Sequence, residues 1–162
     1  MRERITVRVL LFDPEGRILL MKGRMTHRPT DRGAWFTVGG GADPGETVED
    51  CARREIAEES GFTDVTLGPI VWHRTSPGEL PDGERVLLRE TYVMAWVPGG
   101  EPVRDNWEAH EHDLVDDLRW WTIEDLAACE DRIFPERLLE LLPGVAAGRY
   151  PETIVDITVR RD

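Results

Sequence analysis

Apolar and β-branched residues gather in short runs along the chain, and polar or glycine-rich turns separate these runs. Runs of this length and composition predict β-strands. The predicted strands are 3–12, 17–23, 35–38, 65–74, 85–97, 117–122 and 152–159. The turn signal DPEG at 13–16 predicts that the first two strands form a hairpin. We also expect 65–74 and 85–97 to pair around the turn-rich segment 75–84.

Three other segments predict helices. The first begins after Thr47, because Asp50 follows it at the spacing of a capping box, and Gly61 is the expected C-terminal cap. Two shorter helices are expected at 122–129 and 134–142. The sequence GGGADPG at 39–45 predicts a loop before the first helix. Strands and helices alternate without a repeat or a linker, which indicates a single α/β domain over residues 1–162.

Composition narrows the functional classes. The chain has a formal net charge of -12, and nucleic acid polymers and anionic membranes both require a cationic surface. No run reaches the roughly 18 apolar residues of a membrane span, and the N-terminus lacks the apolar core of a signal peptide. Two cysteines, far apart, do not form a disulfide framework. We therefore expect a cytoplasmic protein that binds neither nucleic acid polymers nor membranes.

The first predicted helix carries three glutamates near its C-terminal end: Glu55, Glu58 and Glu59. At about 100° per residue they share one face with small apolar residues earlier in the helix. Carboxylates there oppose the helix dipole at about 0.3–1 kcal/mol each, and Glu55 and Glu59 repel each other at i,i+4. A divalent cation would reverse these unfavourable terms, and Mg²⁺ or Mn²⁺ prefers oxygen ligands of this kind. The alternative is an acidic helix end that faces solvent.

The residues around these glutamates resemble a known motif. Gly40, five residues, Glu46, seven residues and then REIAEESGF at 54–62 fill all nine fixed positions of the 23-residue Nudix box. The chain is therefore similar to Nudix hydrolases. This resemblance implies an α/β/α sandwich with a mixed sheet. It also implies metal-assisted hydrolysis of the pyrophosphate bond in a nucleoside diphosphate linked to another moiety.

The resemblance assigns roles within the box. Glu55, Glu58 and Glu59 match the metal-binding glutamates, and Gly39 matches a position whose backbone carbonyl often adds a ligand. Arg54 and Glu46 match a charged pair that orients these side chains. Similar enzymes place the general base either on the box, here Glu55 or Glu59, or on a distant loop.

Loop 98–113 offers the candidates for such a distant base or an extra ligand. They are Glu108, His110, Glu111 and His112, and we favour Glu111. The alternative for each is an ordinary solvated loop residue. Glu90 lies within a predicted strand, where it either reaches the metal site or pairs with an arginine.

The expected substrate is a small nucleotide, and its leaving group stays open. Trp35 and Trp107 are the candidates for stacking a base, which contributes about 1–3 kcal/mol. Four residues before the box are candidates for binding phosphate, with a solvated loop as the alternative: Arg24, His27, Arg28 and Arg32. Nucleoside triphosphates, oxidised nucleotides, dinucleoside polyphosphates and nucleotide sugars all remain candidates. ADP-ribose is a further possibility that the sequence does not specifically support. The resemblance also implies a homodimer.

Two other functions compete with a Mg²⁺- or Mn²⁺-dependent hydrolase. One is a catalytically silent, nucleotide-sensing module with a Nudix-like fold. The other is an unrelated α/β protein in which residues 40–62 are an acidic helix without a metal. The complete box favours the enzyme over both, because a sensor would usually carry an eroded box.

Overall fold

The computed structural model describes residues 1–24, 30–80, 82–104 and 115–160. Its helices are α1 (Val48–Ser60), α3 (Ile123–Ala127) and α4 (Leu138–Ala146). Its strands are β1 (Arg2–Phe12), β2 (Ile18–Gly23), β3 (Ala34–Gly41), β4 (Thr66–Glu79), β5 (Arg85–Trp96), β6 (Val115–Trp121), β7 (Ile133–Phe134) and β8 (Val155–Asp156). Among the described residues, no helix is long and apolar enough to span a membrane.

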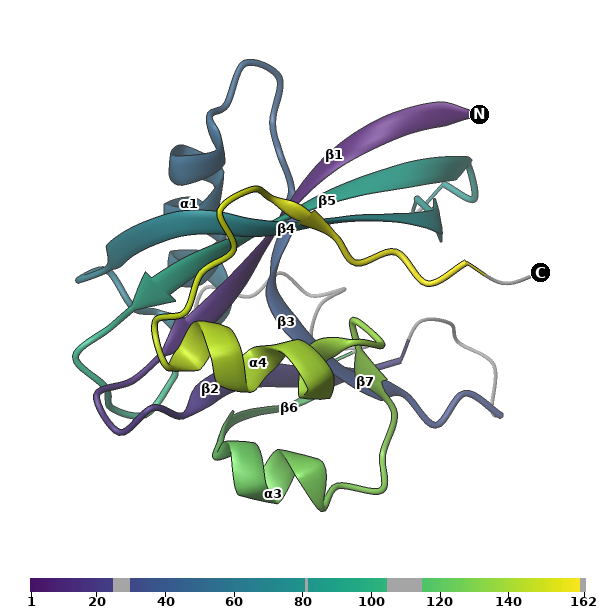
Figure 1. The fold of residues 1–162 in the computed structure, drawn as a ribbon. Helices are drawn as coiled ribbons and strands as arrows, with labels where there is room; N and C mark the ends of the chain where they lie inside the picture. The colour runs from purple at the N-terminus through teal and green to yellow at the C-terminus, as the bar shows by residue number, and fades with distance from the viewer. Residues whose placement is uncertain (25–29, 81, 105–114, 161–162) are drawn as a thin grey trace.

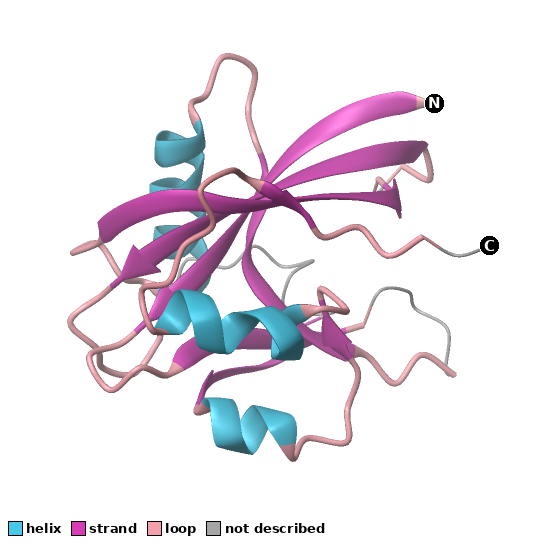
Figure 2. Cartoon of the chain, in the orientation of Figure 1, coloured by secondary structure: helices cyan, strands magenta, loops and turns pink. Residues whose placement is uncertain are grey.

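The eight strands form one mixed sheet (Figures 1 and 2). The strand order is β6-β2-β3-β1-β5-β4-β8, and β7 pairs in addition with β3. The central strand β1 runs parallel to β5 and antiparallel to β3. Helix α1 covers one face of the sheet, and α3 and α4 cover the other. The predicted α/β/α sandwich with a mixed sheet is therefore confirmed.

The alternation of side chains along β1 separates two cores. Val7, Val9 and Leu11 face α1, whereas Leu10 and Phe12 face the side of α3 and α4. A strand buried on both faces reads as a nearly continuous apolar run, which is what the second half of β1, residues 7–12, shows. Arg8 is the exception in this run, and it lies on the face of Leu10 and Phe12.

Two expectations about the N-terminal half are wrong. The first two strands do not form a regular hairpin, because β1 meets β2 only at Phe12 and Ile18 and otherwise pairs with β3 and β5. The glycines 39–41 are not loop but the end of β3. Their pairing with β1 holds this segment extended even though glycine has a low strand propensity.

The paired strands β4 and β5 confirm the expected pairing, but β4 is longer than the sequence indicates. It continues through part of the turn-rich segment to Glu79, because its backbone stays paired with β5. Strand β6 and helix α3 lie where they were expected, and the Thr122 side chain caps α3 by accepting a hydrogen bond from the Asp125 backbone.

The C-terminal elements differ more from expectation. Residues 133–134 form β7, and α4 begins only at Leu138 and continues beyond Pro143 to Ala146. The proline removes one helical hydrogen bond, while buried Leu142 and Val145 keep the helix on the core. The last predicted strand shortens to β8, two residues beside β4.

Candidate active site

Helix α1 carries the acidic residues of the site. The Thr47 side chain accepts a hydrogen bond from the Asp50 backbone at 3.1 Å, and Gly61 ends the helix with φ 80°. Both predicted caps are confirmed. Cys51 and Ile56 pack on the sheet, and the same side of the helix places the carboxylates of its last turns against β3.

Two of the three glutamates are buried. Glu55 is 9% exposed and Glu59 is 7% exposed, whereas the side chain of Glu58 is 44% exposed. Burial raises the pKa of Glu59 well above its usual value, and the negative charge of Glu55 and a hydrogen bond to it raise this pKa further. The end of the helix therefore holds like charges in a setting that disfavours ionisation.

The glycine segment of β3, Gly39 to Gly41, receives these carboxylates. The Gly39 backbone donates a hydrogen bond to Glu59 Oε2 at 3.4 Å. A Cβ atom at Gly40 would lie 2.5 Å from Glu55 Oε1, closer than any real contact. A Cβ at Gly39 would overlap the backbone of β1, and Gly39 has φ 144°. Position 39 therefore has to be glycine, and the lack of a Cβ at Gly40 leaves room for the Glu55 carboxylate.

Arg54 is the positive charge of this cluster. Its guanidinium forms a two-pronged contact with Glu46, with Nε 2.9 Å from Oε2 and Nη2 2.8 Å from Oε1. This contact lowers the pKa of Glu46 to about 2. Nη1 of the same guanidinium lies 3.0 Å from Glu55 and 3.3 Å from Glu58. Arg54 therefore contacts both carboxylates while it is held by Glu46.

The donor set fits a divalent cation by its chemistry. In the described part of the chain, no three acidic, histidine or cysteine side chains already converge on one point, and the Arg54 guanidinium lies between Glu55 and Glu58. The positively charged guanidinium of Arg54 thus already contacts two of the three glutamates. Carboxylates and the Gly39 carbonyl are hard oxygen ligands of the kind that Mg²⁺ and Mn²⁺ prefer.

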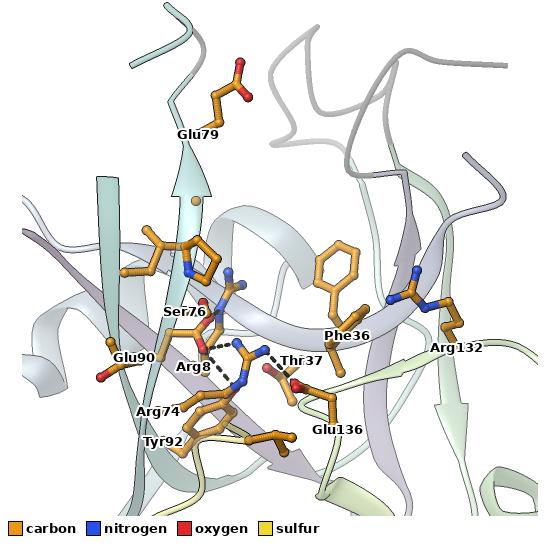
Figure 3. A pocket seen from close by; sticks show the side chains of 16 residues that line it. Arg8, Phe36, Thr37, Arg74, Ser76, Glu79, Glu90, Tyr92, Arg132 and Glu136 are labelled. Carbon is orange, nitrogen blue, oxygen red and sulfur yellow. Dashed lines mark hydrogen bonds and ion pairs between the residues drawn. The ribbon is translucent and has the colours of Figure 1, made fainter. Parts of the chain in front are cut away.

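A pocket of about 710 Å³ lies on the sheet face opposite to α1, and its lining includes Arg8, which also contacts the Gly39 backbone (Figure 3). Four charged side chains cross it in alternating sign. Glu90 is buried between Arg8, at 3.5 Å, and Arg74, at 2.6 Å. Arg74 also contacts Glu136 at 2.6 Å. The alternative in which Glu90 pairs with an arginine is therefore the one that the structure shows.

Phe134 supplies an aromatic wall of the same pocket. The guanidinium of Arg132 lies 5.1 Å from the centre of its ring, and that of Arg74 lies 5.8 Å away. Arg8 connects the pocket to the acidic cluster, because its Nη1 lies 3.4 Å from the Gly39 carbonyl oxygen. Arg8 is therefore the residue through which the pocket adjoins the glycine segment.

The predicted substrate residues are distributed differently. Trp35 is 3% exposed, and its ring packs edge-on against Trp121 with centroids 4.9 Å apart. This packing does not favour base stacking. Arg24 follows β2 beside Gly33, and neither it nor Arg32 lines the pocket. The remaining candidates lie outside the described residues: His27, Arg28, Trp107, Glu108, His110, Glu111 and His112.

Apart from Glu90, sequence reasoning missed the residues that line the pocket. Arg8 had a usable signal, since it is a charge within an otherwise apolar strand. Glu136 had none, because its partner Arg74 is 62 positions away and the two meet only through the sheet. Phe134 was assigned to a helix, which concealed its position on β7.

Comparisons with known proteins extend these observations. A model of the NUDIX domain matches residues 2–142. The chain is 47% identical over 162 residues to an RNA pyrophosphohydrolase of Caulobacter vibrioides, covering 93% of this chain and 91% of that protein. It is 41% identical over 125 residues to an oxidized purine nucleoside triphosphate hydrolase of Mus musculus, covering 73% and 76%. A solved MutT NUDIX hydrolase from Burkholderia pseudomallei is 26% identical with a TM-score of 0.57, covering 90% of this chain and 99% of that chain.

Proposed function

The chain belongs to the Nudix hydrolase family, and we propose that it is a Mg²⁺-dependent member whose pocket holds the base of a small nucleotide substrate. As a Nudix hydrolase it cleaves the pyrophosphate bond of a nucleoside diphosphate linked to another moiety. The family generally uses a divalent metal, and Mn²⁺ is the second candidate.

The observation that carries this proposal is the position of the acidic cluster. Glu55 and Glu59 meet the glycine segment on one side, and Arg8 links the same segment to the pocket. A nucleotide with its base in the pocket would therefore place its phosphates next to the glutamates. The pocket volume of about 710 Å³ is within the roughly 300–1,000 Å³ of small-molecule sites.

Each residue of the box has a proposed task. Glu55, Glu58, Glu59 and the Gly39 carbonyl would hold the metal. Bound Mg²⁺ would neutralise phosphate charge and lower the pKa of a bound water. Arg54, itself fixed by Glu46, keeps the carboxylates in place.

The general base is proposed to be Glu55 or Glu59 on the box, with Glu111 as the alternative from the loop outside the described residues. Loss of turnover in a Glu111→Gln variant, with metal binding intact, would favour the loop residue.

The pocket supports recognition of a base. Phe134 offers an aromatic face, and the Glu136 carboxylate is oriented by Arg74 and can accept hydrogen bonds from base N–H groups. The two relatives described above are named as an RNA pyrophosphohydrolase and as an oxidized purine nucleoside triphosphate hydrolase. We propose a free nucleotide, because a net charge of -12 disfavours a nucleic acid polymer.

The test is product release from a panel of nucleotides with Mg²⁺, with Mn²⁺ and with chelator. We expect metal-dependent release of a nucleoside monophosphate, and we expect Glu58→Gln to lose most turnover while the fold stays intact. The matched control is Glu49→Gln, which changes an exposed glutamate in the first turn of the same helix. Wild-type turnover in Glu58→Gln would refute the role of Glu58. Metal binding without turnover of any nucleotide would favour the sensor instead.

The proposals for the oligomeric state and for the cellular location rest only on membership of the family. We propose a homodimer that acts in the cytoplasm. Light scattering on the purified chain measures the first, and a monomer at all concentrations would refute it.

A further inference from the structure

Arg8 is the one charged residue in the buried half of β1, and its guanidinium has two partners. Its Nε lies 3.5 Å from Glu90 Oε1, and its Nη1 donates a hydrogen bond to the Gly39 carbonyl oxygen at 3.4 Å. Arg8 and Gly39 are opposite each other in the ladder between β1 and β3. One guanidinium thus connects a buried carboxylate of the pocket to the backbone of the glycine segment.

The backbone of Gly39 is bound by side chains on both of its polar groups. Its N–H donates a hydrogen bond to Glu59 Oε2 at 3.4 Å, and its carbonyl oxygen accepts the one from Arg8. The φ of 144° at Gly39 is a conformation that residues with a Cβ rarely adopt. Because glycine has the largest backbone freedom of any residue, the direction of its carbonyl depends on such contacts.

Glu90 holds Arg8 in place in turn. Its side chain is 6% exposed, it contacts Arg74 at 2.6 Å, and it accepts a hydrogen bond from the Tyr92 hydroxyl at 3.5 Å (Figure 3). Arg8, Tyr92 and Arg74 belong to the three neighbouring strands β1, β5 and β4. The negative charge of Glu90 also offsets the positive charge of Arg8, so this guanidinium opposes a nearby cation less than an unpaired one would.

We propose that Arg8 is a positioning residue for the metal site: held by Glu90, it directs the Gly39 carbonyl oxygen toward the cation. The inference rests on the proposed function, in which this oxygen is one of the metal ligands. A carbonyl oxygen has two lone pairs, so it can accept the hydrogen bond from Arg8 and bind a cation at the same time. Removing a group that holds a metal ligand in place typically lowers metal affinity about 10- to 100-fold.

The competing explanation is that Arg8 only neutralises buried Glu90. Arg74 separates the two, because it pairs with the same carboxylate and makes no hydrogen bond to the glycine segment within the part of the chain that the structure describes. A substitution at either arginine removes one partner of Glu90. Only the substitution at Arg8 also frees the Gly39 carbonyl.

The experiment measures the Kd of Mn²⁺ for the metal-free protein by electron paramagnetic resonance, without nucleotide. We expect Arg8→Met to weaken Mn²⁺ binding about tenfold or more, and Arg74→Met to change it by less than about twofold. Arg8→Lys should restore part of the loss, because lysine returns the charge without the fork that reaches two partners. Glu90→Gln should weaken binding as well, and adding it to Arg8→Met should cost little more, because both act through one contact. If Arg8→Met does not fold, Arg8→Lys and Glu90→Gln provide the same test.

A second readout needs no metal. The Gly39 carbonyl shares its peptide unit with the Gly40 N–H, so the Gly40 amide resonance of protein labelled with ¹⁵N-glycine reports the position of this peptide. We expect the resonance to move in Arg8→Met and to stay in place in Arg74→Met.

Unchanged or tighter Mn²⁺ binding in Arg8→Met would overturn the inference while the hydrolase stands, and so would equal losses in Arg8→Met and Arg74→Met. A Gly40 resonance that does not move in Arg8→Met would overturn it whatever the metal result. Absence of Mn²⁺ and Mg²⁺ binding by the wild type would instead refute the proposed function, and with it the role of Arg8 toward a metal.

Discussion

Substitution of Gly40 by alanine tests whether the glycine segment positions the carboxylates of α1 for the proposed reaction. A Cβ at this position would lie 2.5 Å from Glu55 Oε1 and 2.7 Å from Glu55 Cδ. Ordinary contact begins near 3.4 Å, so the carboxylate has to withdraw by roughly 1 Å. A misplacement of about 1 Å can cost about 100-fold in rate. We therefore expect kcat to fall about 100-fold.

The fold should tolerate the same substitution. The clashing atoms belong to the end of a side chain, which can rotate at a cost of about 0.5–1.5 kcal/mol for a strained rotamer. In a domain of this size, 1 kcal/mol corresponds to about 2–4 °C in Tm. The assay is thus steady-state hydrolysis together with thermal unfolding, and we expect a large loss in the first and a small one in the second.

Gly144→Ala is the matched control. Gly144 lies within α4, and the nearest atom to its added Cβ is the Arg149 carbonyl oxygen at 3.9 Å. Alanine in a helix should stabilise by about 0.5–1 kcal/mol, and activity should not change. Adding Gly40→Ala to Glu55→Gln should cost little further activity, because both changes act through one side chain. Wild-type kcat in Gly40→Ala, or independent losses in the double variant, would refute the reasoning.

Three further substitutions test the charges of the site. Burial raises the pKa of Glu59 above 4.5, so protonated Glu59 favours folding below that pH, and this contribution to stability is lost as pH rises through the raised value. In urea with chelator, Glu59→Gln should therefore be more stable than wild type, by a margin that grows from pH 5 to 8. Equal unfolding curves for the two proteins at pH 8 would contradict this. Glu46→Gln releases Arg54, and we expect kcat to fall about tenfold with metal still bound, whereas unchanged kcat would exclude the orienting role. Arg74→Ala leaves buried Glu90 with Arg8 as its ion-pair partner and the Tyr92 hydroxyl as a donor, and should reduce the free energy of unfolding by about 3 kcal/mol, measured by denaturant titration. A loss below about 1 kcal/mol would show that the pair contributes little.

Local signals explain why the helix and its caps could be predicted. The Thr47 cap, the Gly61 stop and the spacing of the three glutamates all lie within one short segment, where chain geometry fixes which residues share a face. The cost of clustering carboxylates at the wrong end of the helix dipole could likewise be worked out from the sequence. In the structure, burial is the largest cause of the raised pKa of Glu59, and the nearby charge of Glu55 adds to it.

Non-local pairing explains what could not be predicted. The glycine segment has no strand propensity of its own and is extended because β1 lies beside it. The pocket brings Arg8, Arg74 and Glu136 together from three distant parts of the chain. No local periodicity reports such a contact, so only the sheet order reveals that their charges alternate across one pocket.

The charges of the site imply that metal and nucleotide bind interdependently. Without a divalent cation, phosphates leaving the pocket would meet Glu55 and Glu59, while Arg54 is already engaged by Glu46. A bound divalent cation would replace this repulsion by attraction, so we expect the nucleotide to bind much more tightly when the cation is present. Linkage makes the effect reciprocal, and the nucleotide must raise metal affinity by the same factor. The net charge of -12 therefore opposes the substrate only while the acidic cluster lacks its counter-charge.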